Sequence, residues 1–124
     1  MKYLLITIGA LLFVGCEAKA PNGSVHIYAK HGDIALVKQH LAAGTDVNAT
    51  DEFLGMTILH DAVLGGQKEI VELLIAEGAD VNARGRVFLT PLDTALKASL
   101  NKEMADLLRK HGGKTGEELK TEGK

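Results

Sequence analysis

The stretch from Gly66 to Asn82, with the sequence GQKEIVELLIAEGADVN, decides the fold. Its apolar residues recur at helical spacing, with glutamates between them, which predicts an amphipathic helix over Lys68 to Glu77. Gly78 follows the helix and suits a left-handed C-terminal cap. A short extended run comes after it.

This stretch belongs to an internal repeat. Gly44, Gly78 and Gly112 are spaced 34 residues apart, and Asp46-Val47-Asn48-Ala49 returns as Asp80-Val81-Asn82-Ala83. A fixed period of this size indicates a repeat architecture, in which each unit buries its apolar face against its neighbours. The repeat therefore predicts a stack of similar units.

The segment from Gly55 to Gly66, GMTILHDAVLGG, completes the second unit. With the following helix it resembles the ankyrin repeat, whose pattern is Gly-x-Thr-Pro-Leu-His-x-Ala-Ala-x-x-Gly, then Ile-Val-x-x-Leu-Leu, then Gly-Ala-x-x-Asn. The resemblance covers Ser24 to Gly112, in units of approximately 24–50, 51–83 and 84–112. It implies an all-α ankyrin-repeat solenoid of stacked helix-turn-helix units with projecting β-hairpin loops. We call these loops finger 1 (residues 51–56) and finger 2 (residues 84–89).

The residues of the second unit support the same fold on physical grounds. Thr57 is a good N-cap because its hydroxyl accepts a free backbone N–H of the first turn. Leu59, Ala62 and Val63 share one face at helical spacing, and Gly65-Gly66 ends this first helix.

The outer units are altered, as the ends of a stack should be. The first has no preceding hairpin, and His40 replaces the apolar residue found at Leu74. In the third, Thr90-Pro91-Leu92-Asp93 resembles a capping box, and an extra residue lies near Lys97 to Leu100. A helix is expected over Asn101 to Lys110, and its polar outer face is typical of a terminal unit.

The carboxyl-terminal segment, 113–124, is charged and has few apolar residues. Thr115-Gly116-Glu117-Glu118 suits the start of one helical turn that would seat Leu119 on the last repeat. A frayed tail fits the composition equally well. Both interpretations stay open here.

The amino terminus resembles a bacterial lipoprotein signal peptide over residues 1–15. An apolar run from Tyr3, shorter than the ~20 residues that span a bilayer, ends in Val14-Gly15-Cys16. The resemblance implies cleavage before Cys16, lipidation of its sulfur, and a tether over 16–23. Phe13 departs from the usual leucine. Cleavage after Ala18-Lys19-Ala20 and an uncleaved anchor are the alternatives.

The lipoprotein interpretation implies a bacterial cell-envelope location, with the chain held on a membrane by the lipid on Cys16. The formal net charge of −2 argues against a nucleic-acid surface, which would be basic. Cys16 is the single cysteine, so the fold needs no internal disulfide. We expect a monomer.

No pattern of catalytic residues is present, so we expect neither an enzyme nor a cofactor. A Gly-rich phosphate loop, a Ser–His–Asp order and paired carboxylates are all missing from the sequence. No two histidines have close metal-ligand spacing, so no metal site is expected either. The resemblance implies a structural role for His26 and His60, which share one repeat position. The other histidines are His31, His40 and His111.

A protein-binding surface is what remains. In ankyrin proteins, partners touch the fingers and the inner helices, and carrying this over residue by residue gives the candidates Phe53, Leu54, Met56, Leu64, Arg84, Arg86, Val87, Leu89, Lys30, His31 and Lys97. We expect one exposed apolar patch made of Phe53, Leu54, Met56, Leu64, Phe88 and Leu89, rimmed by Arg84, Arg86, Asp51 and Glu52. Alternatively, Phe53 and Phe88 fold back between the hairpins. The segment from Asn48 to Thr57, which holds finger 1, is one residue longer than the segment from Asn82 to Thr90, which holds finger 2.

These observations predict a membrane-anchored module that binds or scaffolds an envelope protein. An accessory or metal-binding protein of an envelope enzyme, using the histidines, is the first alternative. An effector or immunity protein is the second. The sequence does not identify the partner protein.

Overall fold

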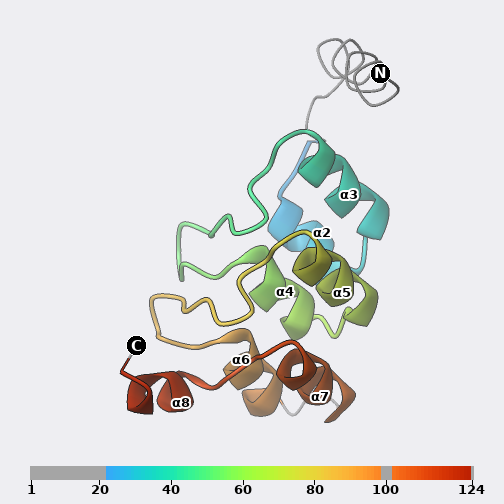
Figure 1. The fold of residues 1–124 in the computed structure, drawn as a ribbon. Coiled ribbons are helices and arrows are strands. Elements are labelled where there is room, and N and C mark those ends of the chain that lie inside the picture. The colour runs from blue at the N-terminus through green and yellow to red at the C-terminus, as the bar shows by residue number, and fades with distance from the viewer. Residues whose placement is uncertain (1–21, 99–101, 124) are drawn as a thin grey trace, which may run out of the picture.

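A computed structural model describes residues 22–98 and 102–123, and it shows helix pairs stacked one on another (Figure 1). The loops between successive pairs project to the same side of the stack. The helices are α2 Val25–His31, α3 Ile34–Ala42, α4 Ile58–Leu64, α5 Lys68–Ala76, α6 Pro91–Lys97, α7 Lys102–Lys110 and α8 Gly116–Thr121. The predicted all-α ankyrin-type solenoid is confirmed.

The expected β-hairpins are reduced to loops. Over the described ranges the only β-pairing is one isolated antiparallel bridge between Thr50 and Thr57, at the base of finger 1. The fingers still project as expected, but turns and side-chain hydrogen bonds hold them in place of a strand ladder.

Helix α4 is the centre of the stack and packs against α2 on one side and α6 on the other. Its side chains Leu59, Ala62 and Val63 are fully buried, as their spacing predicts. A Cβ atom on Gly65 would collide with the backbone carbonyl of Lys30, so this glycine allows α2 and α4 to approach closely. Ile70, Val71 and Leu74 of α5 complete the same core.

Three helices begin with the same device, a threonine capping box. The threonine side chain accepts the N–H of the residue three positions on, whose own side chain accepts the threonine N–H. These pairs are Thr57 with His60, Thr90 with Asp93, and Thr115 with Glu118. The cap therefore recurs at the start of each inner helix from α4 to α8.

His60 joins one cap to the next finger. Its Nδ1 accepts the backbone N–H of Thr57 at 3.1 Å, and its Nε2 donates to the carbonyl of Leu89 at 2.8 Å. Burial lowers the pKa of His60, and the contact with Leu89 and the neighbouring carboxylates oppose this effect only in part. The neutral ring therefore satisfies both of its nitrogens inside the fold.

A repeated asparagine makes a second link between units. Asn48 Oδ1 accepts the N–H of Asp80 at 2.7 Å, and Asn82 Oδ1 accepts the N–H of Lys114 at 2.7 Å. Asn82 also donates from its side-chain amide to the carbonyl of Gly112 at 3.1 Å. The asparagine of each repeated Asp-Val-Asn-Ala sequence thus fixes the backbone of the following unit.

The carboxyl-terminal segment forms the capping turn, α8, which acts as a shortened inner helix. The carboxylate of Asp93 accepts the N–H of Gly116 at 2.8 Å, and the hydroxyl of Thr90 donates to the carbonyl of Lys114 at 2.6 Å. Leu119 is 6% exposed. These contacts extend the line of caps beyond the third unit.

At the other end of the stack, His40 lies buried beside the ring of Tyr28, with ring centroids 5.8 Å apart. The predicted signal peptide and Cys16 lie outside the described residues, as does most of the turn where the extra residue near Leu100 is expected.

We predict that His60 gives the fold a pH-dependent stability. Its folded-state pKa lies below the ordinary value near 6.5, so its contribution is complete above that pH and declines as pH falls below it. Urea unfolding at pH 7.5 and 5.5 should show His60→Gln losing about 1–3 kcal/mol at pH 7.5 and a smaller pH dependence than the parent.

The exposed His31 supplies the matched control. His31→Gln should keep the stability and the pH dependence of the parent protein. An unchanged pH dependence in His60→Gln would contradict the assignment.

Candidate protein-binding surface

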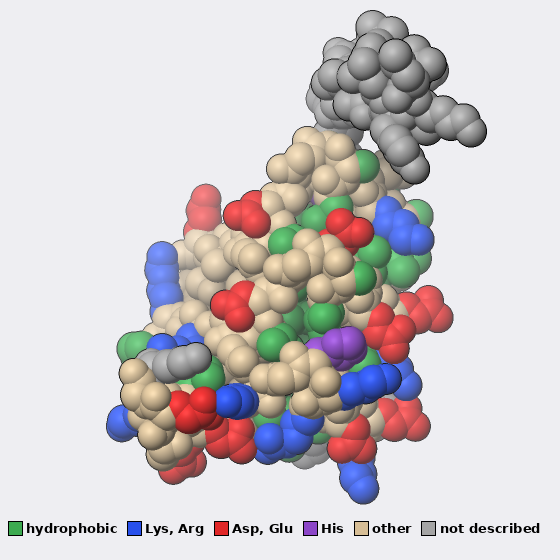
Figure 2. Space-filling model, in the orientation of Figure 1, with side chains coloured by type: hydrophobic (Ala, Val, Ile, Leu, Met, Phe, Trp, Pro, Cys, Tyr) green, Lys and Arg blue, Asp and Glu red, His purple; other side chains and the backbone are tan. Residues whose placement is uncertain are grey.

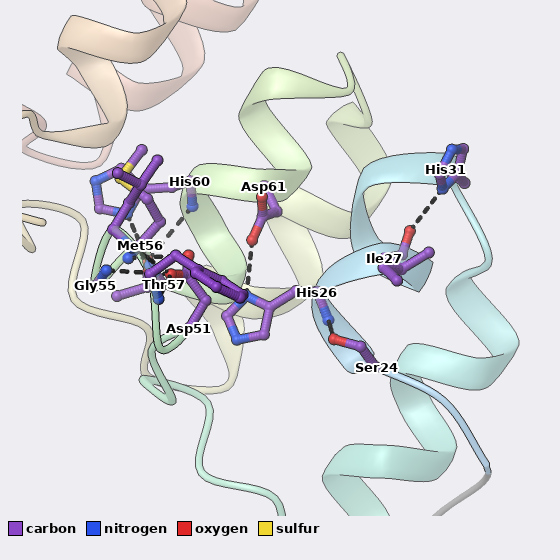
Figure 3. A network of polar contacts seen from close by, with 12 residues as sticks. Ser24, His26, Ile27, His31, Asp51, Gly55, Met56, Thr57, His60 and Asp61 are labelled. Carbon is purple, nitrogen blue, oxygen red and sulfur yellow. Dashed lines mark hydrogen bonds and ion pairs between the residues drawn. The ribbon is translucent and has the colours of Figure 1, made fainter.

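Finger 1 is organised by the carboxylate of Asp51 (Figure 3). Its Oδ1 accepts the backbone N–H groups of Phe53, Leu54 and Gly55 at 2.9, 2.7 and 3.2 Å, and its Oδ2 accepts that of Met56 at 3.2 Å. The Asp51 N–H donates to the carbonyl of Met56 at 2.9 Å and closes the loop. One side chain therefore satisfies the donors of four consecutive residues.

These bonds set the charge state of Asp51. Burial opposes the charged form, but the four backbone N–H groups together outweigh it and lower the pKa of this carboxyl group below its usual value. The sequence indicated Asp51 only as part of a charged rim. An aspartate four residues before a loop glycine was the available signal for this turn.

Finger 2 has a shorter turn. The N–H of Phe88 donates to the carbonyl of Gly85 at 2.8 Å, and the N–H of Gly85 donates to that of Leu89 at 3.3 Å. This pattern is typical of a three-residue hairpin loop that ends in a left-handed residue. Between its closing residues finger 1 has one residue more, as the spacing predicted.

Phe88 occupies that left-handed position with a φ of 59°. It is the only described non-glycine residue with a positive φ, and the corresponding residue in finger 1 is Gly55, with a φ of 65°. The left-handed conformation costs a residue with a side chain roughly 1–2 kcal/mol. Packing does not offset this cost, because the side chain of Phe88 is 72% exposed.

The two fingers are joined to each other. The backbone N–H of Arg86 donates to the carbonyl of Leu54 at 2.7 Å, and its guanidinium Nη1 donates to the carbonyl of Phe53 at 3.3 Å. A Cβ on Gly85 would collide with Met56 Sδ and with the Leu54 carbonyl oxygen, so the loops are in close contact. The fingers therefore present a joint surface.

Four apolar side chains, which we call the apolar finger patch, lie on that surface. Phe53 is 84% exposed, Leu54 50%, Val87 49% and Phe88 72%. Neither phenylalanine folds back between the fingers, so the open alternative is the one observed. Figure 2 shows hydrophobic atoms at the left edge of the molecule with charged groups around them.

The remaining finger candidates surround this patch. Arg84 and Arg86 are exposed, whereas Met56 and Leu89 are half-buried at the bases of the fingers. The expectation that Met56 is exposed is therefore corrected, since it lies against Gly85 of finger 2. Its contact with a partner stays a prediction.

A groove of about 670 Å³ adjoins the patch where finger 2 meets α8. It is lined by Arg84, Phe88, Leu89, Asp93, Gly116, Glu117 and Lys120. The sequence allows a capping turn over this segment, but it does not indicate that the turn lines a groove with finger 2. The groove extends the candidate surface from the fingers to the end of the stack.

The other predicted contact residues lie elsewhere. Lys30 and His31 end α2, Leu64 ends α4 and Lys97 ends α6, and all four are exposed. The fingers adjoin the opposite ends of these helices, and a seven-residue helix is ~10 Å long. The apolar finger patch therefore does not extend to Leu64, which corrects the expected single patch.

The histidines that sequence analysis considered as possible ligands do not share a site. His31 contacts the carbonyl of Ile27 at 3.0 Å on the exposed side of α2, whereas His40 is buried beside Tyr28. His26 faces Asp61, with 2.7 Å between Nδ1 and Oδ2, although it shares a repeat position with His60. None of the described helices, α2 to α8, has the length and apolar character of a membrane span.

The family model for ankyrin repeats (3 copies) matches residues 25–118, which is most of the chain. The chain belongs to the ankyrin repeat family. Repeats of this family usually mediate binding to another protein, and the exposed patch on the fingers agrees with that role.

Curated relatives share these repeats within longer proteins. The chain is 43% identical over 60 residues to the mouse 2-5A-dependent ribonuclease, an alignment that covers 48% of this chain and 8% of that protein. It is 38% identical over 72 residues to an ankyrin repeat-containing protein of Schizosaccharomyces pombe, covering 58% and 33%.

A third relative is the serine/threonine-protein kinase VIK of Arabidopsis thaliana, with 35% identity over 98 residues, which cover 78% of this chain and 22% of the kinase. The chain spans a third or less of the length of each of these relatives. The similarity therefore identifies the repeats and does not assign the activities of those longer proteins to this chain.

We predict that the Asp51 carboxyl group titrates below the ordinary aspartate value of 3.8. Because the folded-state pKa is lowered, the stability that this carboxylate confers is complete above the unfolded value and is lost as pH falls through the folded one. Carbon-13 NMR of the carboxyl group measures its pKa. The amide shifts of Phe53 to Met56 show whether the finger backbone responds to the same titration.

The finger 1 amides should shift together with the carboxyl group, and Asp33, whose side chain makes no cap hydrogen bond, is the comparison within the same spectra. Titration of Asp51 at the ordinary value, with unmoved finger amides, would contradict this account of finger 1.

Proposed function

We propose that this chain is a lipid-anchored ankyrin-repeat module of the bacterial envelope that holds another protein through the apolar finger patch, without catalytic activity of its own. The observation that carries the proposal is Phe88. Its aromatic ring is exposed on a backbone conformation that favours glycine. Strain kept at an exposed position is typical of functional sites.

The composition of the surface supports protein binding. Contiguous exposed apolar groups mark interaction sites, and aromatic and arginine residues dominate the energetics of protein interfaces. Phe53 and Phe88 supply the aromatic groups, while Arg84 and Arg86 supply the charge. A partner with an apolar pocket and carboxylates at its edge fits this arrangement.

The construction of the fingers also favours tight binding. A loop that is ordered before binding loses less conformational entropy when the complex forms. Asp51 orders finger 1, and Arg86 joins it to finger 2 through the carbonyls of Phe53 and Leu54. The patch is therefore presented in one arrangement.

Anchoring rests on the amino-terminal sequence. Val14-Gly15-Cys16 suits lipidation of Cys16, and residues 16–23 leave a short tether before Ser24, which caps α2. Several acyl chains at ~0.8 kcal/mol per buried methylene hold such a protein on a membrane. A tethered monomer would retain its partner at the envelope.

In-cell crosslinking tests the binding surface. A photoreactive amino acid at position 54 should yield a discrete adduct with another protein, whereas the same group at exposed Glu103 of α7 should not. Equal yields of the same adduct from both positions would exclude the fingers as the contact site.

Phe88→Gly separates stability from binding. It removes the left-handed strain, so urea unfolding should show a gain of up to about 1 kcal/mol, while the adduct from position 54 falls at least tenfold. Val87→Gly, beside it on the same loop, is the control that should gain no stability. An adduct from position 54 that is retained in Phe88→Gly together with Phe53→Asp would contradict the proposal.

Anchoring has its own test. Cys16→Ser should move the protein out of the membrane fraction while its unfolding midpoint and its helical circular dichroism stay unchanged, because Cys16 lies outside the described repeats. Unchanged fractionation would contradict lipidation and leave the finger-binding proposal standing.

A further inference from the structure

Three potential metal ligands meet where α2, finger 1 and α4 come together. They are His26 of α2, Asp51 of finger 1 and Asp61 of α4, and one ligand atom from each lies within 4.8 Å of the others. Figure 3 shows His26 directed at Asp61, with Asp51 alongside. All three side chains are half-buried, so the cluster is partly shielded yet open to solvent.

The charges of the cluster are not balanced. Asp61 has His26 as its only ion-pair partner among the described residues, and Asp51 has none there. Asp51 is instead held by backbone N–H groups, which favour its charged form. Even a protonated His26 would leave one negative charge, so the cluster is complementary to a divalent cation.

His26 is free to act as a ligand in a way that its repeat equivalent is not. His60 uses both ring nitrogens within the fold, on Thr57 and on Leu89. His26 has a single side-chain contact, from Nδ1 to Asp61 Oδ2 at 2.7 Å, and its side chain is 16% exposed. The one side-chain contact of His26 therefore lies inside the cluster, and a metal bound there would break no bond from this ring to the backbone.

The chemistry of the donors indicates the metal. One imidazole nitrogen and two carboxylate oxygens form a set used by zinc, with bond lengths of ~2.0–2.2 Å and water in an open fourth position. Ligand atoms around a tetrahedral ion of that size lie about 3.3 Å apart. The separations in the cluster, from 2.7 Å to within 4.8 Å, bracket that value.

We propose that His26, Asp51 and Asp61 form a zinc site that fastens finger 1 to α2 and α4. The metal replaces the contact between His26 and Asp61, and Asp51 binds it through an oxygen while keeping its bonds to the finger backbone. Zinc binding therefore orders the loop that presents Phe53 and Leu54. The site depends on no partner and stands without the proposed function.

Zinc chloride titrated into the purified full-length chain tests the site by calorimetry and thermal unfolding. All proteins carry Cys16→Ser, so that no free thiol competes for the metal. We expect one zinc ion per chain and a higher unfolding temperature. Binding should weaken as the pH falls, because protons compete with zinc for its ligands.

His26→Gln and Asp61→Asn remove one ligand each, and His31→Gln removes an exposed histidine of the same helix. Changes to residues that merely support a ligand cost about 10–100-fold in affinity, so each ligand variant should bind zinc at least tenfold more weakly. His31→Gln should bind as the parent does. Circular dichroism confirms that each variant remains folded.

Absence of saturable zinc binding by the parent protein would overturn the proposal, and the contact between His26 and Asp61 would then be a hydrogen bond alone. Equal weakening by His31→Gln and His26→Gln would also overturn it, because the binding would then be non-specific. Magnesium chloride is the comparison, and equally tight magnesium binding would exclude the nitrogen ligand.

Discussion

The two hydrogen bonds of the buried His60 imidazole hold the central helix and the second finger together. The ring closes the cap of α4 through Thr57 and reaches the carbonyl of Leu89 at the base of finger 2. A buried polar group without partners would be costly, so the ring, the cap and the finger are stable only together. Asp93 and Thr90 continue this line to Gly116 and Lys114 of the end cap.

This line of caps explains how a small repeat protein holds an exposed apolar surface. The apolar side chains of α4 and α5 pack in the core, where Leu59, Ile70 and Leu74 are buried. The fingers contribute little to that core and are held by polar contacts at their bases. The outward residues of the fingers therefore contribute no packing to the core. The stability of the stack offsets the backbone strain at Phe88.

Much of the fold was predictable because it repeats. The period, the threonine caps and the left-handed Gly78 each follow from local rules, and the structure has them where expected. The site was less predictable, since its geometry depends on contacts distant in sequence. Arg86 meets Leu54 32 residues away and His26 meets Asp61 35 residues away, and no local pattern indicates either pair. The sequence does not show that Leu64 lies at the end of α4 that is remote from the fingers, so it was expected in the patch. Lipidation of Cys16 stays a prediction.

The stack holds both fingers in one ordered arrangement before any partner binds. Amide hydrogen exchange at neutral pH, followed residue by residue by NMR on the free protein, tests it most directly. We expect the amide of Leu54, bonded to Asp51, and the amide of Arg86, bonded to the Leu54 carbonyl, to exchange clearly more slowly than that of exposed Glu52. Exchange of Leu54 and Arg86 at the rate of an unstructured chain, with the amides of α4 still protected, would contradict it.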